Sequence, residues 1–308
     1  MGWGRWTTSD WDAYASRSTT GRTTAEIFAN HGLDPDLDPK GVRFRESCDS
    51  TDNPLSTAII VGLDVTGSMH TVLDTMARKG LNTLATSIYD RKPVPDPHLM
   101  FMGIGDVEAG DRAPLQVTQF EADIRIAKQL AQIYLEGGGG GNNHESYLLP
   151  WYFAALHTRI DCLLKRGKKG YLFTIGDEEP QLLLKAPDIL KVLGTRPNRD
   201  LSAEALLDMV SRQYEVFHVM VEEGSYYASC GRRVEEAWRR LLGQRALRLS
   251  DHTKLAEVIV SAIQVHEGAA AEQVCESWDG STRSVVKRAL QGLVSRPRRT
   301  LTDLIRFA

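Results

Sequence analysis

The chain alternates between short apolar runs and stretches in which apolar residues recur at helical spacing. Uninterrupted apolar, β-branched runs are typical of buried strands, and apolar positions three or four residues apart are typical of helices. The pattern predicts buried strands at 56–63, 98–106, 170–177 and 214–221. It predicts helices at 69–88, 121–135, 146–165, 234–242 and 253–266, and two further helical segments within 181–213.

Two shorter segments complete the predicted sheet. Residues 115–120 alternate between apolar and polar, which predicts a half-exposed strand, and residues 245–249 predict a short edge strand. Because the link between 98–106 and 115–120 is short, we expect these two strands to form an antiparallel hairpin at a sheet edge. The remaining order of strands and helices favours an α/β fold with a doubly wound, mostly parallel sheet.

The segments on either side of this region have a different composition. Residues 1–55 hold three of the six tryptophans, Trp3, Trp6 and Trp11, followed by a Ser/Thr-rich stretch and a run of turn residues. We interpret them as an N-terminal arm that packs on the core or docks on another chain, because three exposed tryptophans are costly in water. One or two helical turns at 25–29, capped by Thr23 or Thr24, are expected within the arm.

The predicted organisation therefore has three parts: the N-terminal arm at 1–55, the α/β domain at 56–267 and a C-terminal helical extension at 268–308. The extension ends in a basic tail that contains Arg296, Arg298 and Arg299. Such a short basic run is typical of a solvated tail, and binding of an anionic partner is the alternative.

Composition excludes several classes of protein. With 308 residues, 42% hydrophobic content and a formal net charge of −3, the chain can bury a large core, and its overall charge does not favour nucleic acid. Its four cysteines are scattered without a CxxC pair, which is typical of a reducing compartment and predicts neither a disulfide frame nor a zinc site. No apolar run approaches the ~20 residues of a membrane span, and residues 1–6 lack a signal-peptide core, so we expect a cytoplasmic protein without a membrane contact.

Oxygen-bearing side chains follow the first predicted strand at alternate positions. They are Asp64, Thr66 and Ser68, and Gly67 between the two hydroxyls allows a sharp turn before the helix. A carboxylate and two hydroxyls at the end of a buried strand suit Mg²⁺ or another hard divalent cation. The simpler alternative is that these residues cap the first helix, although three oxygens at alternate positions exceed what capping needs.

The sequence Asp64-Val65-Thr66-Gly67-Ser68 resembles the Asp-x-Ser/Thr-x-Ser signature of the von Willebrand factor A (VWA) family. The order of predicted elements over about residues 56–267 also resembles that family, including the early antiparallel hairpin. The resemblance implies a Rossmann-like VWA fold with the six core strands in the order 3-2-1-4-5-6. It also implies a metal-ion-dependent adhesion site (MIDAS), in which a second loop supplies a hydroxyl, usually from Thr, and a later strand end supplies an Asp.

This sequence matches the first and third of those loops better than the second. Asp177 follows the third buried strand and takes the place of the later Asp, although the chain reads Thr174-Ile175-Gly176-Asp177 where the family commonly has Thr-Asp-Gly. The second loop is the polyglycine stretch 137–141, and it offers Asn143, Glu145 or Ser146 instead of Thr. A Glu145 ligand would add negative charge, bind the ion more tightly and weaken its attraction for an external carboxylate.

From the resemblance we expect a non-enzymatic scaffold or adaptor that binds a protein partner, whose carboxylate completes the shell of a bound Mg²⁺, Mn²⁺ or Ca²⁺. Some cytoplasmic bacterial proteins of this family work beside AAA+ ATPases, which makes such an ATPase a family-level expectation for the partner. The predicted metal-site residues are Asp64, Thr66, Ser68, Glu145, Ser146 and Asp177.

Other chemistries remain open at this stage. A Mg²⁺- or Mn²⁺-dependent hydrolase or phosphotransfer enzyme could use the acidic strand ends Asp64, Asp106 and Asp177 with Glu178, although Arg112 and Lys185 are the nearest candidates for a phosphate clamp. Nucleotide binding at the glycine run is weakly supported, because it lacks Gly-Lys-Ser/Thr and follows a helix. Zinc would need His70 and His144 to converge with a carboxylate.

Overall fold

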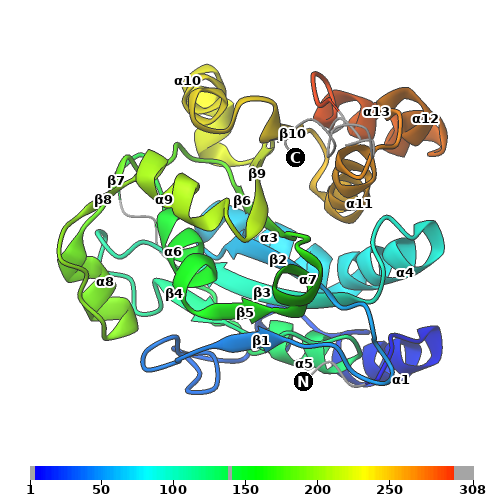
Figure 1. Cartoon of the computed structure of the whole chain (residues 1–308), viewed down its shortest axis with the longest axis horizontal. Helices are drawn as coiled ribbons and strands as arrows, with labels where there is room; N and C mark the ends of the chain where they lie inside the picture. The colour runs from blue at the N-terminus through cyan, green and yellow to red at the C-terminus, as the bar shows by residue number, and fades with distance from the viewer. Residues whose placement is uncertain (1–3, 138–140, 295–308) are drawn as a thin grey trace, which may run out of the picture.

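A six-stranded sheet forms the centre of the computed structural model, which describes residues 4–137 and 141–294 (Figure 1). Its strand order, β4-β3-β2-β6-β9-β10, is the predicted 3-2-1-4-5-6 read along the chain. All neighbouring pairs are parallel except β3 and β4, which form the predicted antiparallel edge pair. The strands of this sheet are β2 (Thr57–Asp64), β3 (Pro97–Ile104), β4 (Leu115–Val117), β6 (Gly170–Gly176), β9 (Tyr214–Val221) and β10 (Ala246–Leu249).

The direction in which the chain adds strands reverses between β2 and β6. From β2 it adds β3 and β4 on one side, and from β6 it adds β9 and β10 on the other. In an open parallel sheet, ligands bind beyond the carboxyl ends of the strands at such a switch point. We call this edge of the sheet, where β2, β3, β6, β9 and β10 end, the carboxyl edge.

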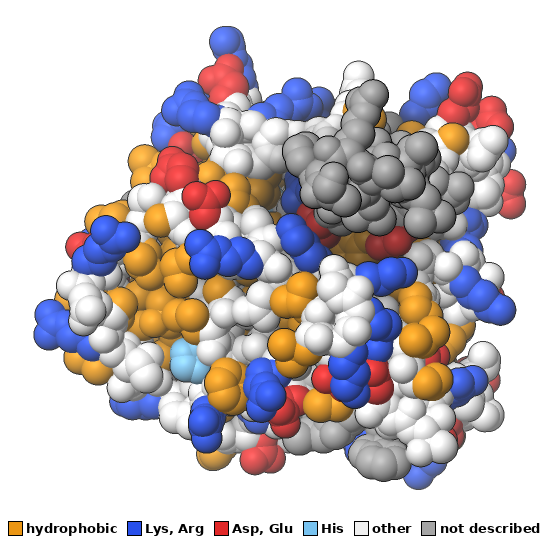
Figure 2. Space-filling view, viewed as in Figure 1, with side chains coloured by type: hydrophobic (Ala, Val, Ile, Leu, Met, Phe, Trp, Pro, Cys, Tyr) orange, Lys and Arg blue, Asp and Glu red, His pale blue; other side chains and the backbone are white. Residues whose placement is uncertain are grey.

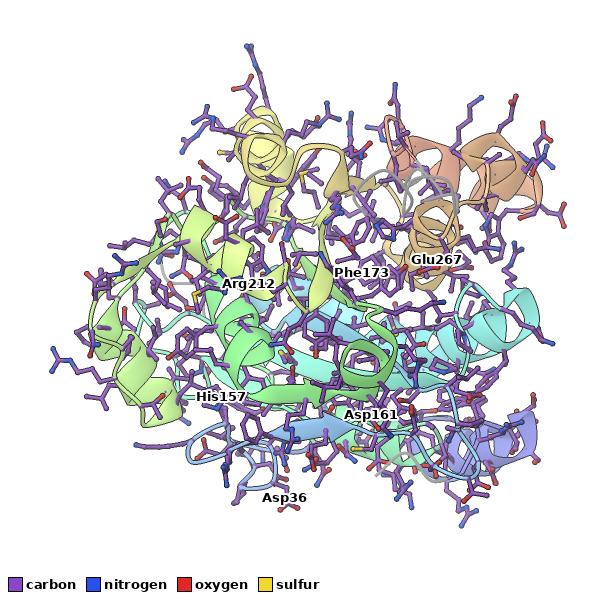
Figure 3. The ribbon with its side chains drawn as sticks, viewed as in Figure 1. Asp36, His157, Asp161, Phe173, Arg212 and Glu267 are labelled. Carbon is purple, nitrogen blue, oxygen red and sulfur yellow. The ribbon has the colours of Figure 1, made fainter. Side chains whose placement is uncertain are left out.

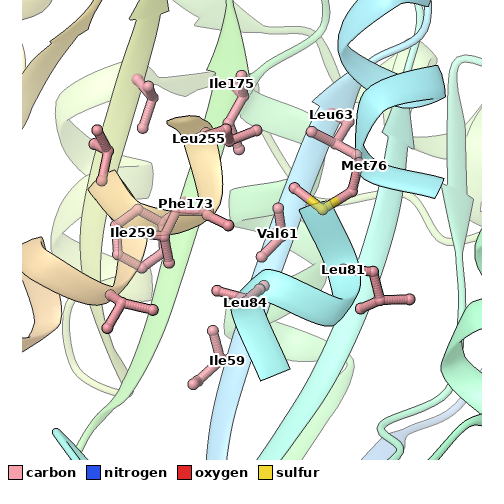
Figure 4. Close-up of a cluster of buried hydrophobic side chains, with 14 of the residues drawn as sticks. Ile59, Val61, Leu63, Met76, Leu81, Leu84, Phe173, Ile175, Leu255 and Ile259 are labelled. Carbon is pink, nitrogen blue, oxygen red and sulfur yellow. The ribbon is translucent and has the colours of Figure 1, made fainter. Parts of the chain in front are cut away.

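Alternate residues of the central strands point to opposite faces, and each face has its own apolar core. In β2, Ile59, Val61 and Leu63 belong to the core on one face, whereas Ala58 and Ile60 belong to the core on the other face. Figure 4 shows the first of these cores. Strands buried on both faces read as continuous apolar runs, which is why the sequence predicts them clearly.

Helices cover both faces of the sheet (Figure 1). They are α1 (Thr8–Ser18), α2 (Thr24–Ile27), α3 (His70–Thr75), α4 (Leu81–Arg91), α5 (Arg125–Ala131), α6 (Leu148–Leu156), α7 (Asp161–Arg166), α8 (Ala186–Leu193), α9 (Ala203–Val210), α10 (Ser225–Leu242), α11 (Leu255–His266), α12 (Ala271–Glu276) and α13 (Gly280–Ala289).

The first predicted helix, 69–88, contains a π-helical turn, Met76–Gly80, between α3 and α4. Its apolar positions are three or four residues apart until a gap of five separates Met76 from Leu81. A π turn accommodates one extra residue, so both side chains still face the core. The gap of five residues between Met76 and Leu81 therefore corresponds to the π-helical turn.

Two predictions about secondary structure are wrong in detail. The helix expected over 146–165 is interrupted after α6 by β5 (Thr158–Ile160), which pairs in parallel with β1 (Arg45–Ser47) of the N-terminal arm. The strand expected to be half-exposed, β4, is fully buried. Its polar residue Gln116 bonds the backbone of Tyr134 after α5, since Gln116 Nε2 donates to Tyr134 O and Gln116 Oε1 accepts from Tyr134 N, both at 2.8 Å. Both differences involve contacts between segments that are distant in the sequence, and such contacts leave no local sequence pattern.

The N-terminal arm and the C-terminal extension share the apolar core of the sheet. Trp6 and Trp11 are buried in the core that contains β2, and so are Val286 and Leu290 of the extension. Of the two caps expected for this segment, Thr23 and Thr24, the structure uses Thr23, which forms a capping box with Glu26. Trp3 and the basic run at 296–299 lie outside the described residues.

Polar contacts also hold the arm to the α/β region. Asp161, labelled in Figure 3 at the start of α7, accepts a hydrogen bond from the backbone N–H of Asp49 at 2.8 Å. Asp49 in turn accepts from Arg166 Nη1 at 2.7 Å and from Ser56 Oγ at 2.7 Å. A short two-stranded sheet, β7 (Leu183–Leu184) with β8 (Leu201–Ser202), completes the fold beyond β6.

The surface in Figure 2 carries Lys, Arg, Asp and Glu side chains interspersed with one another, with hydrophobic side chains gathered over α6 and its neighbours α8 and α9. Within the described residues, every helix is too short or too polar to span a bilayer.

Candidate functional site

Asp64 ends β2 at the carboxyl edge and is completely buried. Its Oδ1 accepts hydrogen bonds from Thr66 N at 2.8 Å and Thr66 Oγ1 at 2.7 Å, and its Oδ2 accepts from Tyr147 Oη at 3.2 Å. Thr66 is the N-cap residue of the 3₁₀ turn Gly67–Met69, yet its side chain makes no capping bond there. Asp64 and Thr66 are therefore bonded to each other, and neither acts as a side-chain cap for the following helix.

Ser68 is the third residue of the predicted motif. Its backbone lies in the same 3₁₀ turn, but its side chain lies outside the described part of the structure. The role predicted for its hydroxyl stays a prediction.

Asp177 follows β6, the strand next to β2 at the switch point. It is 3% exposed, and its Oδ2 accepts from the backbone N–H of Tyr226 at 2.9 Å in the first turn of α10. Gly224, just before α10, must be glycine in this arrangement, because a Cβ there would lie 2.2 Å from Asp177 Oδ2. The carboxylate of Asp177 is thereby fixed by a helix N-terminus at the same edge as Asp64.

The second predicted loop reaches the same edge between α5 and α6. Ser146 is buried, and its Oγ accepts from Val107 N at 2.9 Å. Glu145 is 1% exposed, and its Oε2 has no hydrogen-bond partner among the described residues. Asn143 is exposed, and its carbonyl accepts from Glu179 N at 3.0 Å, which ties the loop to the segment after β6. Of the three candidates, Glu145 is the residue with an unused buried oxygen.

Sequence reasoning missed one residue of this site and gave two others a minor place. Tyr147 is the missed residue, and its Oη donates a hydrogen bond to Asp64 Oδ2. It reaches Asp64 across the backbone of Gly176, where an added Cβ would lie 1.9 Å from Tyr147 Oη. Asp106, after β3, is buried and accepts from Asn142 Nδ2. Glu178, whose Oε2 is unpartnered, follows Asp177. Asp106 and Glu178 both follow strand ends, a pattern that is visible in the sequence, whereas no local sequence pattern points to Tyr147.

Burial and mutual repulsion disfavour ionisation of the carboxyl groups at this site and raise their pKa values. Burial, followed by repulsion from Asp64 and Glu178, raises the pKa of Glu145 above its ordinary value. Burial and repulsion from Asp64 and Asp177 raise the pKa of Glu178 to about 8. The pKa of Asp64 is raised mainly by burial, although its bonds from Thr66 oppose the shift. Among the described residues, no Lys, Arg or His forms an ion pair with any of these three carboxylates.

This donor set suits a hard divalent cation. It consists of oxygen atoms only, it is largely buried, and it leaves Glu145 Oε2 without any partner. The described acids of the site are less tightly gathered than a preformed three-carboxylate cage. Among the described residues, the His, Cys, Asp or Glu side chains whose ligand atoms all lie within 4.8 Å of one another are Glu223, Asp251 and His252. The carboxylates of this site are not among them. A cation at Asp64 would therefore need hydroxyl donors or small movements of the second loop.

The two histidines considered as zinc ligands, His70 and His144, contact different groups in the structure. His70 Nε2 lies 3.0 Å from Val65 O and 2.7 Å from Glu136 O, so this ring contacts backbone carbonyls. His144 lies 4.0 Å from Glu108. Residues 138–140 of the glycine run lie outside the described part of the chain, and the nucleotide hypothesis falls on them.

Comparison with known proteins gives distant matches of fold only. No protein-family model and no curated protein sequence matches the chain. Solved structures similar to it include the pilus adhesin SpaC from Lactobacillus rhamnosus GG in its open conformation, with 11% identity, a TM-score of 0.44 and coverage of 73% of this chain and 31% of that chain. A second structure of SpaC has 10% identity, a TM-score of 0.44 and coverage of 73% and 32%.

A von Willebrand factor type A protein from Catenulispora acidiphila is also similar, with 12% identity, a TM-score of 0.39 and coverage of 70% of this chain and 44% of that chain. The chain thus spans less than half the length of each of these proteins. The strand order and the edge hairpin of the present structure define the predicted VWA-like α/β fold.

Proposed function

We propose that the chain is a metal-dependent protein-binding module, a scaffold or adaptor, with a MIDAS-type Mg²⁺ site at the carboxyl edge. The single observation that supports this most strongly is the group of buried carboxyl groups of Asp64, Glu145 and Asp177, with which no described Lys, Arg or His forms an ion pair. Burying uncompensated charge is costly, and a bound divalent ion offsets that cost.

In this proposal Asp64, Thr66 and Ser68 hold the ion, Asp177 lies in or near its shell, and Glu145 or Ser146 supplies the second loop. The ion, Mg²⁺ or in its place Mn²⁺ or Ca²⁺, would supply a positive point that a protein partner contacts. An acidic partner residue that completes the shell is the expectation from the family resemblance, and an AAA+ ATPase is the family-level expectation for the partner itself.

A partner-capture experiment tests this function. The full chain is immobilised and exposed to its native lysate in Mg²⁺ or in EDTA, beside an Asp64→Asn variant whose fold is checked by circular dichroism. The proposal predicts partners that are retained only by the unmodified chain in Mg²⁺. Identical retention by the variant, or retention in EDTA, contradicts it.

An enzymatic role would give a different result. In the structure Lys185 pairs with Glu108 at 2.9 Å, so this candidate phosphate clamp is already engaged. Turnover of generic phosphate esters in saturating Mg²⁺ or Mn²⁺, lost in Asp64→Asn, would favour the hydrolase or phosphotransfer alternative over the binding module.

A further inference from the structure

The turn that carries the predicted motif is closed by the side chain of the residue that follows it. His70 is the first residue of α3, and its Nε2 lies 3.0 Å from the backbone oxygen of Val65, five residues earlier. Thr66 and Ser68 lie on the turn between these two residues. The backbone N–H of Val65 donates to Ile104 O of β3 at 2.9 Å, so both backbone groups of Val65 have partners.

The same ring nitrogen also contacts the segment before the second loop. His70 Nε2 lies 2.7 Å from the backbone oxygen of Glu136, which directly precedes the glycine run. Glu136 is itself held, because its Oε1 accepts from Ala113 N at 2.8 Å. Two residues earlier, Tyr134 exchanges two hydrogen bonds of 2.8 Å with the side chain of Gln116 in β4. His70 therefore connects the motif turn to a segment that is anchored on the edge strand.

These two contacts determine which ring nitrogen of His70 carries a proton. A carbonyl oxygen only accepts hydrogen bonds, so Nε2 must be a donor whose proton is shared between Val65 O and Glu136 O. A nitrogen that binds a metal ion must be unprotonated, so Nε2 is not available as a ligand. His70 can therefore act on a metal site only through the backbone that it holds with this nitrogen.

Resting on the proposed function, we infer that His70 is a positioning residue of the metal site. Its Nε2–H holds the Val65 carbonyl and thereby the turn that presents Thr66 and Ser68, and it fixes this turn relative to the start of the second loop. Ligands that are already ordered cost less to arrange when the ion binds, and groups that orient a ligand tune its affinity. Loss of this donor should therefore weaken Mg²⁺ binding in a chain that still folds.

Two substitutions separate the hydrogen bond from the bulk of the side chain. His70→Leu removes the N–H donor, whereas His70→Gln keeps an N–H group at the end of its side chain. Mg²⁺ affinity of the full chain and of both variants is measured by calorimetry, and the free energy of unfolding without Mg²⁺ is measured in urea. We expect His70→Leu to bind Mg²⁺ about ten-fold more weakly than the unmodified chain, and His70→Gln to stay within about three-fold of it.

His157→Leu is the matched control. His157, labelled in Figure 3, is also partly buried, and its Nδ1 lies 2.9 Å from Val42 O in the N-terminal arm. The variant thus loses the same kind of contact between a ring nitrogen and a carbonyl oxygen, but none with the motif turn. We expect it to lose stability in urea and to keep the Mg²⁺ affinity of the unmodified chain.

A measurement on the unmodified chain tests the same contact without a substitution and without Mg²⁺. Long-range ¹H–¹⁵N spectra of the imidazole rings in mildly alkaline buffer report which nitrogen of each ring carries the proton. We expect the ring of His70 to be protonated on Nε2. A proton on Nδ1 alone overturns the inference and leaves the proposed function standing.

The outcomes of calorimetry separate this inference from the proposed function. Mg²⁺ uptake with unchanged affinity in His70→Leu overturns the inference alone. An equal loss of affinity in His70→Leu and His70→Gln, or in His70→Leu and His157→Leu, also overturns it, because the loss would then not follow the N–H donor at the motif turn. Absence of Mg²⁺ uptake by the unmodified chain removes the proposed function and the inference with it.

Discussion

Tyr147 Oη donates a hydrogen bond to Asp64 Oδ2 at 3.2 Å, and it reaches this carboxylate across the backbone of Gly176. The contact joins the helix after the second loop to the end of the first core strand. It orients the carboxylate at the switch point of the sheet, so both residues can be tested for their part in the proposed metal site.

Tyr147→Phe removes this donor from a buried carboxylate. We expect a loss of about 1–3 kcal/mol in the free energy of unfolding and about a ten-fold weaker affinity for Mg²⁺, because groups that orient a metal ligand tune its binding. Chemical denaturation and calorimetry measure the two effects. Tyr214→Phe is the matched control, since Tyr214 is equally buried but bonds Thr158 Oγ1 at the opposite edge. If both variants bind Mg²⁺ with unchanged affinity, Tyr147 has no part in the site.

Gly176→Ala tests the close approach directly. The added Cβ would lie 1.9 Å from Tyr147 Oη and 2.6 Å from its Cζ, so the ring must move away from Asp64. We expect the free energy of unfolding to fall by about 1–3 kcal/mol through overpacking. Gly32→Ala is the control, because a Cβ at Gly32 meets no atom within 4 Å. Equal stability of the two variants in urea would show that Tyr147 does not pack as described.

His98, at the start of β3, gives a pH dependence that is separate from the metal site. Burial lowers the pKa of its ring to about 4, and Ser47 Oγ lies 3.1 Å from its Nδ1. Because the unfolded chain binds the proton more readily, stability present above about pH 6.5 is lost as the pH falls through about 4, by about 3 kcal/mol at most. His98→Gln should flatten this acid limb in denaturation curves at pH 4–7. The exposed control His31→Gln should leave it unchanged, and an identical limb in both variants would contradict the assignment.

Asp49 anchors the N-terminal arm to α7. Burial opposes its ionisation, but hydrogen bonds from Arg166, Ser56 and Lys165 outweigh burial and hold its pKa well below the ordinary value. We expect Asp49→Asn to lower the free energy of unfolding at pH 7 by about 2 kcal/mol, since Arg166 loses its ion-pair partner. Glu236→Gln breaks a highly exposed pair with Arg232 and should change stability by less than about 0.5 kcal/mol. Thermal unfolding compares the two, and similar effects would mean that the arm is not held by Asp49.

The sequence predicts the sheet well because the strands next to the switch point are buried on both faces. Residues such as Ile59 to Leu63 form continuous apolar runs, and the strand order was implied by the resemblance to the VWA family. The contacts of the arm were not predictable in this way. The pairing of Arg45–Ser47 with Thr158–Ile160 joins residues more than a hundred positions apart and interrupts a helical pattern.

The residues of the site also divide into those that a local sequence pattern predicts and those that depend on contacts between distant segments. Asp64, Thr66 and Asp177 stand at strand ends, where a local pattern marks them, and the structure describes Asp64 and Asp177 as buried acids at one edge. Tyr147 and Gly176 were not predicted as partners, because their contact depends on how α6 crosses the end of β6. The unused oxygen of Glu145 also becomes visible only when its surroundings are known.

Titration of the metal-free chain with Mg²⁺ in a calorimeter, beside Asp64→Asn, is the most direct test of the central claim. The account predicts uptake of one Mg²⁺ per chain by the unmodified protein and none by the variant, with both folded by circular dichroism. No uptake by the unmodified chain, or the same uptake by Asp64→Asn, would contradict it.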